Sequence, residues 1–402
     1  MKRICLVVVG LYINLLSAFA QVTDSAKYQR RKLKLDEINF VSSYYHQDGN
    51  NSAVTGGIGT EKLTDYSNSF EVKFLKYNKR RKKVNFDFDL GIDYYTSASS
   101  DNIDPSTISS ASSHDLRIYP SVTRAVTDEK KGSSFLTNLS YSQESDYRSY
   151  GLAVAISRKS KDNSSELTAR LQLYFDRVEI ILPVELRTPG TGGLPGAPNE
   201  HHYPWKNRNT YSTSFTFSKI ADQRLQLMWL LDITYQQGFL GLPFHRIYFK
   251  DNALSTERLP SARFKIPVAI RASYFLGDKI IVRSLYRFYK DDWGLTAHTA
   301  DLETSFKITP FFSVTPFYRY YTQTAIDYFA GYQEHLESES YYSSNYDLSK
   351  FSSHFFGGGF RLAPPRGLFG HKNWNAVELR YGHYIRTDGL HSDILSLYLK
   401  YK

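Results

Sequence analysis

A histidine, a serine and an aspartate stand side by side near the end of the chain, at His391-Ser392-Asp393. These residue types can form a nucleophile with its base, provided that the two side chains lie within hydrogen-bond reach. The surrounding sequence alternates apolar and polar residues as a strand does, and neighbouring residues on a strand point to opposite faces. We therefore interpret the motif as a polar turn beside a strand, and we predict that the chain is not an enzyme.

Three further motifs could in principle bind ligands. Glu200-His201-His202 offers metal ligands, but a metal site needs three or four converging ligands held by supporting hydrogen bonds. Gly357-Gly358-Gly359 resembles a phosphate-binding loop, but no helix follows it, so a bend or a close approach in a strand fits better. The basic run 79–83 is interpreted as a solvated turn that can also touch anionic headgroups. No metal and no cofactor are predicted.

The N-terminus has the pattern of a secretory signal peptide. Two basic residues precede an apolar run over 4–16, and Ala18-Phe19-Ala20 supplies the small residues of a cleavage site. The run is shorter than the ~20 residues of a membrane-spanning helix. We expect residues 1–20 to be removed. Because Cys5 is the only cysteine, the mature chain would then contain no disulfide, thiolate metal site or cysteine nucleophile.

Composition and periodicity favour a membrane-spanning barrel. Mean hydropathy is low, at −0.43, yet 15% of the residues are aromatic. That combination suits a wall with an apolar outer face, a wet inner face and aromatic rims. The segment 84–94 alternates apolar residues with asparagine and aspartate, a period that a helix cannot produce. The net charge of +10 is spread along such segments, so nucleic acid is not predicted as a partner.

The pattern predicts an all-β fold, a transmembrane antiparallel up-and-down β-barrel of about sixteen strands, with fourteen or eighteen left open. The expected strands are 37–47, 64–77, 84–97, 114–127, 133–144, 147–158, 165–178, 209–219, 223–236, 263–275, 279–291, 294–308, 312–325, 351–363, 374–387 and 392–402. Every second connection is short, whereas the others include all the long ones, as expected for periplasmic turns and outer loops. Residues 1–20 are thus expected to be a signal peptide, 21–36 a periplasmic lead-in and 37–402 the barrel.

In each expected strand the polar residues alternate with apolar ones and share one face, and this polar face predicts which side chains line the inside. Acidic residues dominate the early strands and arginines the late ones. The expected pore-lining residues are Asp87, Asp89, Asp93, Arg263, Arg271, Arg283, Arg287, Arg319, Arg361 and Arg380. Such charges can create a field across a water-filled constriction. They can equally form ion pairs that fill the interior, because buried charges must be paired. The sequence leaves both alternatives open.

Several segments of the chain are similar to one family. These segments are 259–267, 286–294 and 315–321, together with the start at 36–40. They resemble the family called domain of unknown function 3570, and the resemblance extends over nearly the whole mature chain. It implies an outer-membrane barrel of a Gram-negative bacterium without an established activity. The family's frequent neighbours imply a small lipoprotein or an envelope redox protein as a partner, and it offers no catalytic residue to carry over.

Together these observations predict a porin-like channel for small solutes or ions in the outer membrane, with membrane lipid as its surroundings. The first alternative is a non-conducting barrel that anchors or exports a partner lipoprotein. The second is an outer-membrane hydrolase. Neither the oligomeric state nor the solute follows from the sequence.

Overall fold

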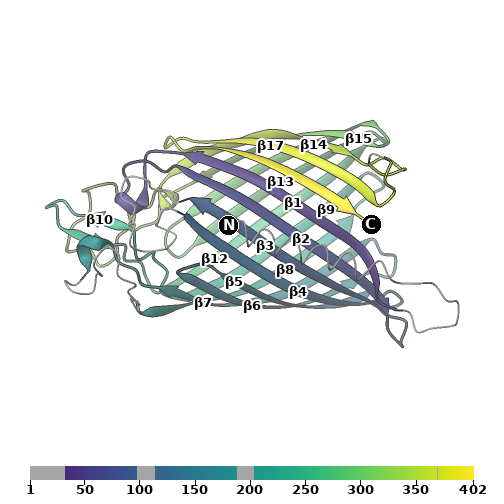
Figure 1. Ribbon diagram of the computed structural model, residues 1–402, viewed down its shortest axis with the longest axis horizontal. Helices are drawn as coiled ribbons and strands as arrows, with labels where there is room; N and C mark the ends of the chain where they lie inside the picture. The colour runs from purple at the N-terminus through teal and green to yellow at the C-terminus, as the bar shows by residue number, and fades with distance from the viewer. Residues whose placement is uncertain (1–31, 97–113, 188–202, 369) are drawn as a thin grey trace. The chain divides into compact units, whose positions relative to one another are not determined.

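A computed structural model describes residues 32–96, 114–187, 203–368 and 370–402. Sixteen strands in these ranges close into a single antiparallel barrel (Figure 1). They are β1 (Lys34–Asp48), β2 (Leu63–Tyr77), β3 (Lys83–Thr96), β4 (His114–Asp128), β5 (Ser133–Gln143), β6 (Tyr147–Lys159), β7 (Ser165–Glu179), β8 (Trp205–Ile220), β9 (Leu225–Gly238), β12 (Ala262–Leu276), β13 (Ile280–Asp291), β14 (Thr296–Thr309), β15 (Phe312–Gln323), β16 (Phe351–Leu362), β17 (Trp374–Arg386) and β18 (His391–Tyr401). The predicted fold class and strand number are confirmed.

The barrel closes because its last strand pairs with its first. β18 runs antiparallel to β1, from Ile38 opposite Tyr401 to Asp48 opposite His391. This pairing leaves neither strand with an open edge, which is what a sheet in hydrocarbon requires. No helix among the described residues is long and apolar enough to cross a membrane.

The two faces of the wall follow the alternation in the sequence. In β3, Phe88 and Leu90 point outward and are 44% and 38% exposed, whereas Asp87 and Asp89 alternate with them on the inner face. The outer face is similarly apolar on the neighbouring strands, where Leu171 is 41% exposed. This surface is suited to contact with hydrocarbon, because exposing such a large apolar area to water is unfavourable.

The two ends of the barrel differ in their connections. At one end most strands are joined by short turns, such as 78–82 and 221–224. The other end has all the longest connections, together with short ones such as 144–146 and 292–295 (Figure 1). The alternation of connection lengths agrees with the prediction. The strand bounds differ by a few residues: β1 begins at Lys34 rather than at 37, and β8 begins at Trp205 rather than at 209.

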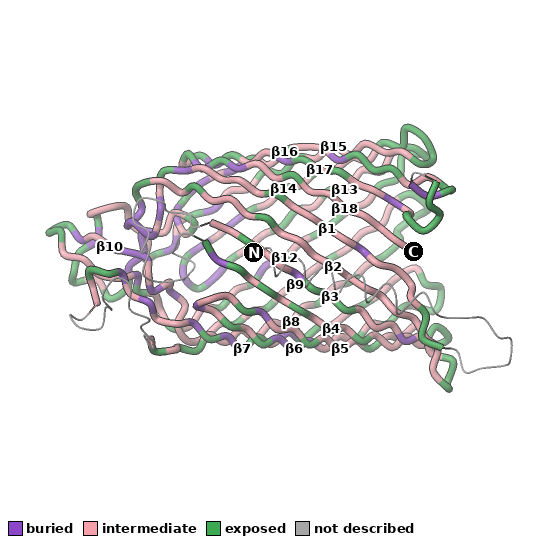
Figure 2. Tube along the Cα trace, in the orientation of Figure 1, coloured by how far each residue is buried: buried purple, intermediate pink, exposed green. Residues whose placement is uncertain are grey.

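The long connections contain structure that the sequence did not predict. We call the segments 49–62, 180–187, 239–261 and 324–350 together the cap. It contains the hairpin of β10 (Arg246–Tyr248) and β11 (Leu254–Thr256). It also holds three short 3-10 helices, η1 (Ala53–Thr55), η2 (Val184–Leu186) and η3 (Tyr346–Leu348). Figure 2 shows buried residues gathered in this part of the chain. Ile247, with 0% exposure, packs with Phe249 and Tyr342 in a small hydrophobic core.

One arginine joins three segments of the cap. Arg246, in β10, donates from Nη1 to the carbonyl oxygen of Val54 at 2.8 Å and from Nη2 to Glu185 Oε2 at 2.9 Å. The Arg246 side chain is buried, and its bond to the Val54 carbonyl is shielded from water, whereas the Glu185 side chain is 49% exposed. The cap is therefore a folded structure rather than a set of free loops.

Candidate pore and its inner wall

An ion pair across two intervening strands identifies the inner face of the barrel. Arg380 on β17 donates from Nη2 to Glu303 Oε2 on β14 at 2.5 Å, although β15 and β16 lie between these strands. Side chains that bridge non-neighbouring strands can meet only on the concave side of a curved sheet. The polar face of the late strands therefore points to the interior of the barrel.

Glycines allow close packing beside this pair. Gly357 on β16 stands opposite Gly382 on β17, and Gly359 stands opposite Arg380. A Cβ atom on Gly357 would lie 2.0 Å from the Tyr381 carbonyl oxygen and 2.9 Å from the Phe317 ring. The triple glycine is therefore a place of close packing on the inner wall, as its position in a strand predicted.

Four arginines surround a cavity of about 270 Å³ at mid-strand height. They are Arg271 on β12, Arg283 on β13, Arg319 on β15 and Arg380 on β17. Glu303 accepts from Arg283 at 2.9 Å as well as from Arg380. Asp301 accepts from Arg319 at 2.7 Å.

The other predicted arginines occupy different positions. Arg361 lies on the inner wall towards the turn end, 3.5 Å from Glu378. Arg287 and Arg263 line a second cavity of about 250 Å³ under the cap. Arg263 differs from the rest, because its side chain is only 12% exposed. It forms a 2.5 Å ion pair with Asp291 and stacks on Trp293 at 4.3 Å.

The three predicted aspartates all lie on β3, one of the early strands. Asp89 accepts from Ser121 Oγ at 3.0 Å, and Asp93 accepts from Ser67 Oγ and from the Tyr119 hydroxyl. These bonds run to β2 and β4, the strands that flank β3. Asp87 has a buried carboxylate oxygen without a hydrogen-bond partner among the described residues.

The sequence prediction missed a cation within this acidic wall. Lys73 on β2 lies between Glu37 at 2.8 Å and Glu71 at 3.0 Å. Lys400 on β18 reaches Glu37 from the other side at 2.5 Å. Both lysines lie on the polar face of their strands. The alternation of apolar and polar residues in β2 is therefore the signal that could have identified Lys73. The acidic wall is therefore partly neutralised.

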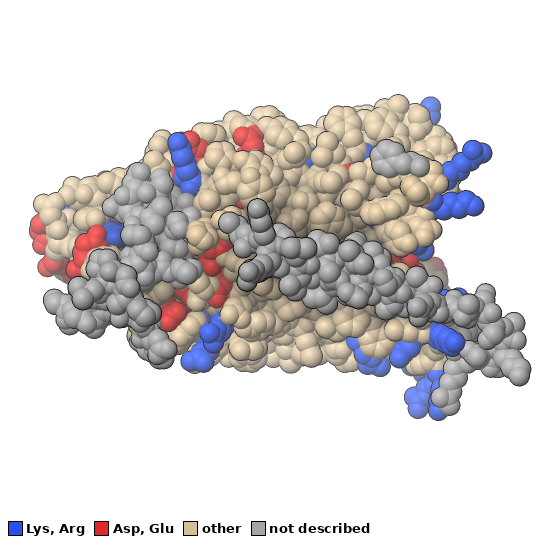
Figure 3. Space-filling view, in the orientation of Figure 1, with Lys and Arg blue, Asp and Glu red and all other residues tan. Residues whose placement is uncertain are grey.

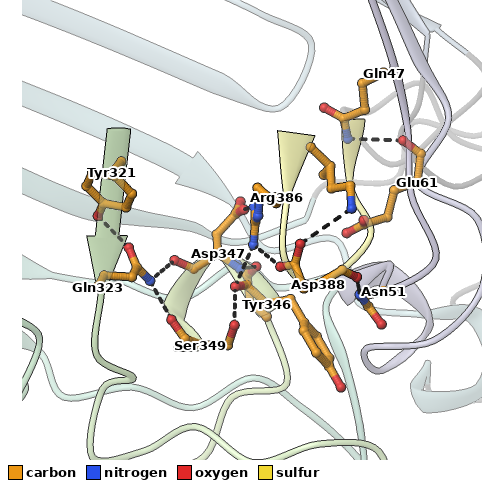
Figure 4. A network of polar contacts seen from close by, with 12 residues as sticks. Gln47, Asn51, Glu61, Tyr321, Gln323, Tyr346, Asp347, Ser349, Arg386 and Asp388 are labelled. Carbon is orange, nitrogen blue, oxygen red and sulfur yellow. Dashed lines mark hydrogen bonds and ion pairs between the residues drawn. The ribbon is translucent and has the colours of Figure 1, made fainter. Parts of the chain in front are cut away.

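The last part of the cap, the segment 344–350 with η3, bonds to the ends of two strands (Figure 4). We call this segment the strap. Arg386, at the end of β17, donates to Asp347 Oδ1 at 2.6 Å, to the Tyr346 carbonyl at 2.9 Å and to Asp388 Oδ2 at 2.5 Å. Gln323 at the end of β15 donates to the carbonyls of Asp347 and Ser349. These bonds fix the strap to the wall on two sides.

Two carboxyl groups of the cap, Glu61 and Glu257, have pKa values shifted in opposite directions. Burial, followed by the nearby charge of Asp347, raises the pKa of Glu61 to about 7. Burial alone would also raise the pKa of Glu257. The His245 imidazole, 3.6 Å away, and hydrogen bonds from Ser343 and the Leu242 backbone amide outweigh it and hold the pKa of Glu257 below its usual value.

The remaining motifs show no catalytic arrangement among the described residues. In β18, Ser392 is buried on the inner face, whereas Asp393 bonds to His383 and Tyr381 on the outer face. Glu200-His201-His202 lies outside the described residues.

A group of three carboxylates has the spacing of a metal site, although none was predicted. Asp115, Glu144 and Asp146 have oxygen atoms within 4.8 Å of one another. Donors already serve two of them: Ser145 Oγ bonds to Asp115 at 2.6 Å, and the Tyr95 hydroxyl bonds to Glu144 at 3.0 Å.

Surface charge differs between the two ends of the molecule. On the face drawn in Figure 3, acidic side chains gather at the cap end, and lysines and arginines project from the turn end. The turn 78–82, with Arg80 and Arg81 exposed, belongs to the basic end. This position agrees with its interpretation as a solvated turn.

Comparisons with known proteins identify one family and several solved structures of low similarity. No curated protein matches the chain. OccK2 (OpdF) of Pseudomonas aeruginosa has a TM-score of 0.41 and 7% identity, over 93% of this chain and 99% of that chain. A BenF-like porin from Pseudomonas fluorescens Pf-5 has a TM-score of 0.42 and 8% identity, over 91% and 97%. OccAB3 of Acinetobacter baumannii has a TM-score of 0.41 and 10% identity, over 92% and 99%.

The barrel assignment rests on the chain's own strand pairing and not on these distant similarities. A family model, described as protein of unknown function DUF3570, matches residues 113–363. That match covers more than half of the chain and confirms the family that the sequence motifs predicted. The chain belongs to the DUF3570 family.

Proposed function

We propose that this protein is a porin-like channel that lets small solutes or ions cross the outer membrane of a Gram-negative bacterium. The observation that supports the proposal is the exposure of charged side chains inside the barrel. The side chains of Arg319, Arg361 and Arg283 are 49%, 48% and 41% exposed although they face the interior. In a filled barrel these groups would be enclosed and would need complete pairing. A water-filled interior explains their exposure.

The proposal includes a route and an orientation. Residues 1–20 would direct export and be removed, the apolar outer face would meet lipid, and the cap would face outward. A cysteine placed at Ser338, which is exposed in the cap, should react with an impermeant thiol reagent on whole cells. A cysteine placed at Arg80 in the turn 78–82 should react only after the cells are opened. The reverse labelling pattern would exclude this orientation.

Conductance of the purified protein tests the channel itself. Insertion into a planar lipid bilayer should give discrete current steps, and heat-unfolded protein in the same detergent should give none. The folded state is verified independently by the shift in gel mobility on heating. A folded barrel that never conducts would contradict the proposal. It would favour the non-conducting alternative, in which the barrel anchors or exports a lipoprotein or serves an envelope redox partner.

A further inference from the structure

The cavity surrounded by Arg271, Arg283, Arg319 and Arg380 carries an excess of positive charge. Four guanidinium groups line it, against the two carboxylates Asp301 and Glu303. Glu303 is shared by two arginines, and Asp301 is paired with one. Arg271 is exposed and forms no ion pair with any described residue. Arginine remains charged at any physiological pH, so the excess of two positive charges is permanent.

Apolar side chains lie beside the guanidinium groups. Phe317 and Phe355 line the cavity with their ring centroids 5.0 Å apart, and Leu285 is also part of the lining. The Arg380 guanidinium lies 4.6 Å from the centre of the Phe317 ring. The cavity thus combines forked donors with a hydrophobic wall.

The size of the cavity suits a small organic molecule. Its volume of about 270 Å³ exceeds the ~150 Å³ that is enough for a benzene ring in a protein interior. The rings of Phe317 and Phe355 pack over glycines of β16 and β17, since a Cβ atom at Gly357 or Gly382 would collide with them. These glycines therefore let the two rings lie close to the wall, where they line the cavity.

We infer that this cavity is a binding site for small organic carboxylates, whose anionic head bonds to the arginines and whose apolar body contacts the phenylalanines. The inference rests on the proposed channel function and names the class of solute that the channel would take. Arg271 is the first candidate to bind the carboxylate, because its guanidinium is accessible and has no competing acid. Two parallel N–H···O bonds give arginine its preference for carboxylates over less directional partners.

Binding of benzoate to the folded protein in detergent, measured by titration calorimetry, tests the site directly. Wild-type protein should bind benzoate, and benzylamine, a cation of similar shape, should not bind. Arg271→Gln should weaken benzoate binding by about tenfold, the loss expected for a charge-assisted bond. Arg224→Gln, which removes the same charge from an exposed turn outside the cavity, should leave binding unchanged. Equal binding by the Arg271→Gln variant would overturn the inference.

A gain-of-affinity variant guards against a general loss of folding. Asp301→Asn removes the acid that competes for Arg319 and should strengthen benzoate binding several-fold. Acetate and inorganic phosphate serve as probes that lack the apolar body. If either binds as tightly as benzoate, the cavity is a simple anion site and the assigned ligand class is wrong.

Bilayer currents separate this inference from the channel proposal. Benzoate added to a conducting channel should reduce the current at concentrations near its dissociation constant, and Arg271→Gln should relieve that block. A channel that conducts but neither binds benzoate nor responds to it would refute the site and leave the channel function standing. A protein that binds benzoate but never conducts would refute the channel and leave the site standing.

Discussion

The wall of the barrel and the cap are stabilised in opposite ways. In the wall, large apolar side chains such as Leu139 and Ile156 are 62% and 60% exposed, because their partner is lipid rather than protein. In the cap, Ile247 and His335 are 0% and 1% exposed within a small core. The wall can depend on hydrocarbon for its hydrophobic contacts, whereas a segment in water must bury its own apolar groups. One chain therefore follows two packing rules.

The strap is where the two regions meet, so breaking its ion pairs should have the largest effect. Arg386→Leu leaves Asp388, whose side chain is only 10% exposed, without its cation, and loss of one partner of a buried pair costs about 3–5 kcal/mol. Asp347 also loses its cation but is 71% exposed, so it adds little to this cost. Residues 344–350 should lose hydrogen-exchange protection while the barrel keeps its heat-dependent gel shift. Arg366→Leu, at the exposed turn end, is the matched control. Undiminished protection of the strap would show that Arg386 does not hold it.

Truncation in the core of the cap should separate the two regions further. Ile247→Ala removes a fully buried side chain and should cost ~2–5 kcal/mol in the cap alone. Phe88→Ala, on the outer face of β3, opens no protein cavity and should leave the cap unaffected. Limited proteolysis of the folded protein should then cut the cap of the first variant and not of the second. Simultaneous unfolding of cap and wall would mean that they form one cooperative unit.

A charge on the outer face should expose the dependence of the wall on lipid. Leu171→Arg should cost ~2–4 kcal/mol in bilayer folding if the residue lies at the midplane. Gln226→Arg, on the inner face of β9, should cost much less because that face is wet. Gln226 is a better control than Gln172, which is buried against Arg170. Equal losses in urea titrations of the two variants would contradict the assignment of the faces.

The smallest effect is expected from the titration of Glu61 in the cap. Its pKa is raised from 4.5 to about 7, so the folded state holds the proton more tightly than the unfolded state. The contribution of this group to stability is therefore full below about pH 4.5 and declines as the pH rises through 7. Glu61→Gln should flatten the pH dependence of hydrogen exchange in segment 49–62 over that window. A wild-type profile that rises with pH would contradict the sign.

The alternation of residue types determined the wall almost completely. Each strand meets lipid on one side and water on the other, so its pattern is set locally and can be recognised without knowing its neighbours. This is why about sixteen strands were predicted with bounds that err by only a few residues. It is also why the sequence showed that the arginines of β12, β13 and β15 share the polar face of their strands. Lys73 carried the same signal and was overlooked.

Only the tertiary structure decided the partners within the wall and the whole of the cap. Glu303 meets Arg380 because the sheet curves over two intervening strands. Arg263 is enclosed by Asp291 at the end of β13 and by Trp293 in the connection that follows. The cap brings Arg246 to Val54, 192 residues away in the chain. Its residues are buried by distant segments rather than by a repeating environment, so no local period encodes their positions. The sequence by itself therefore determined which side chains face inward, and the fold decided which of them meet.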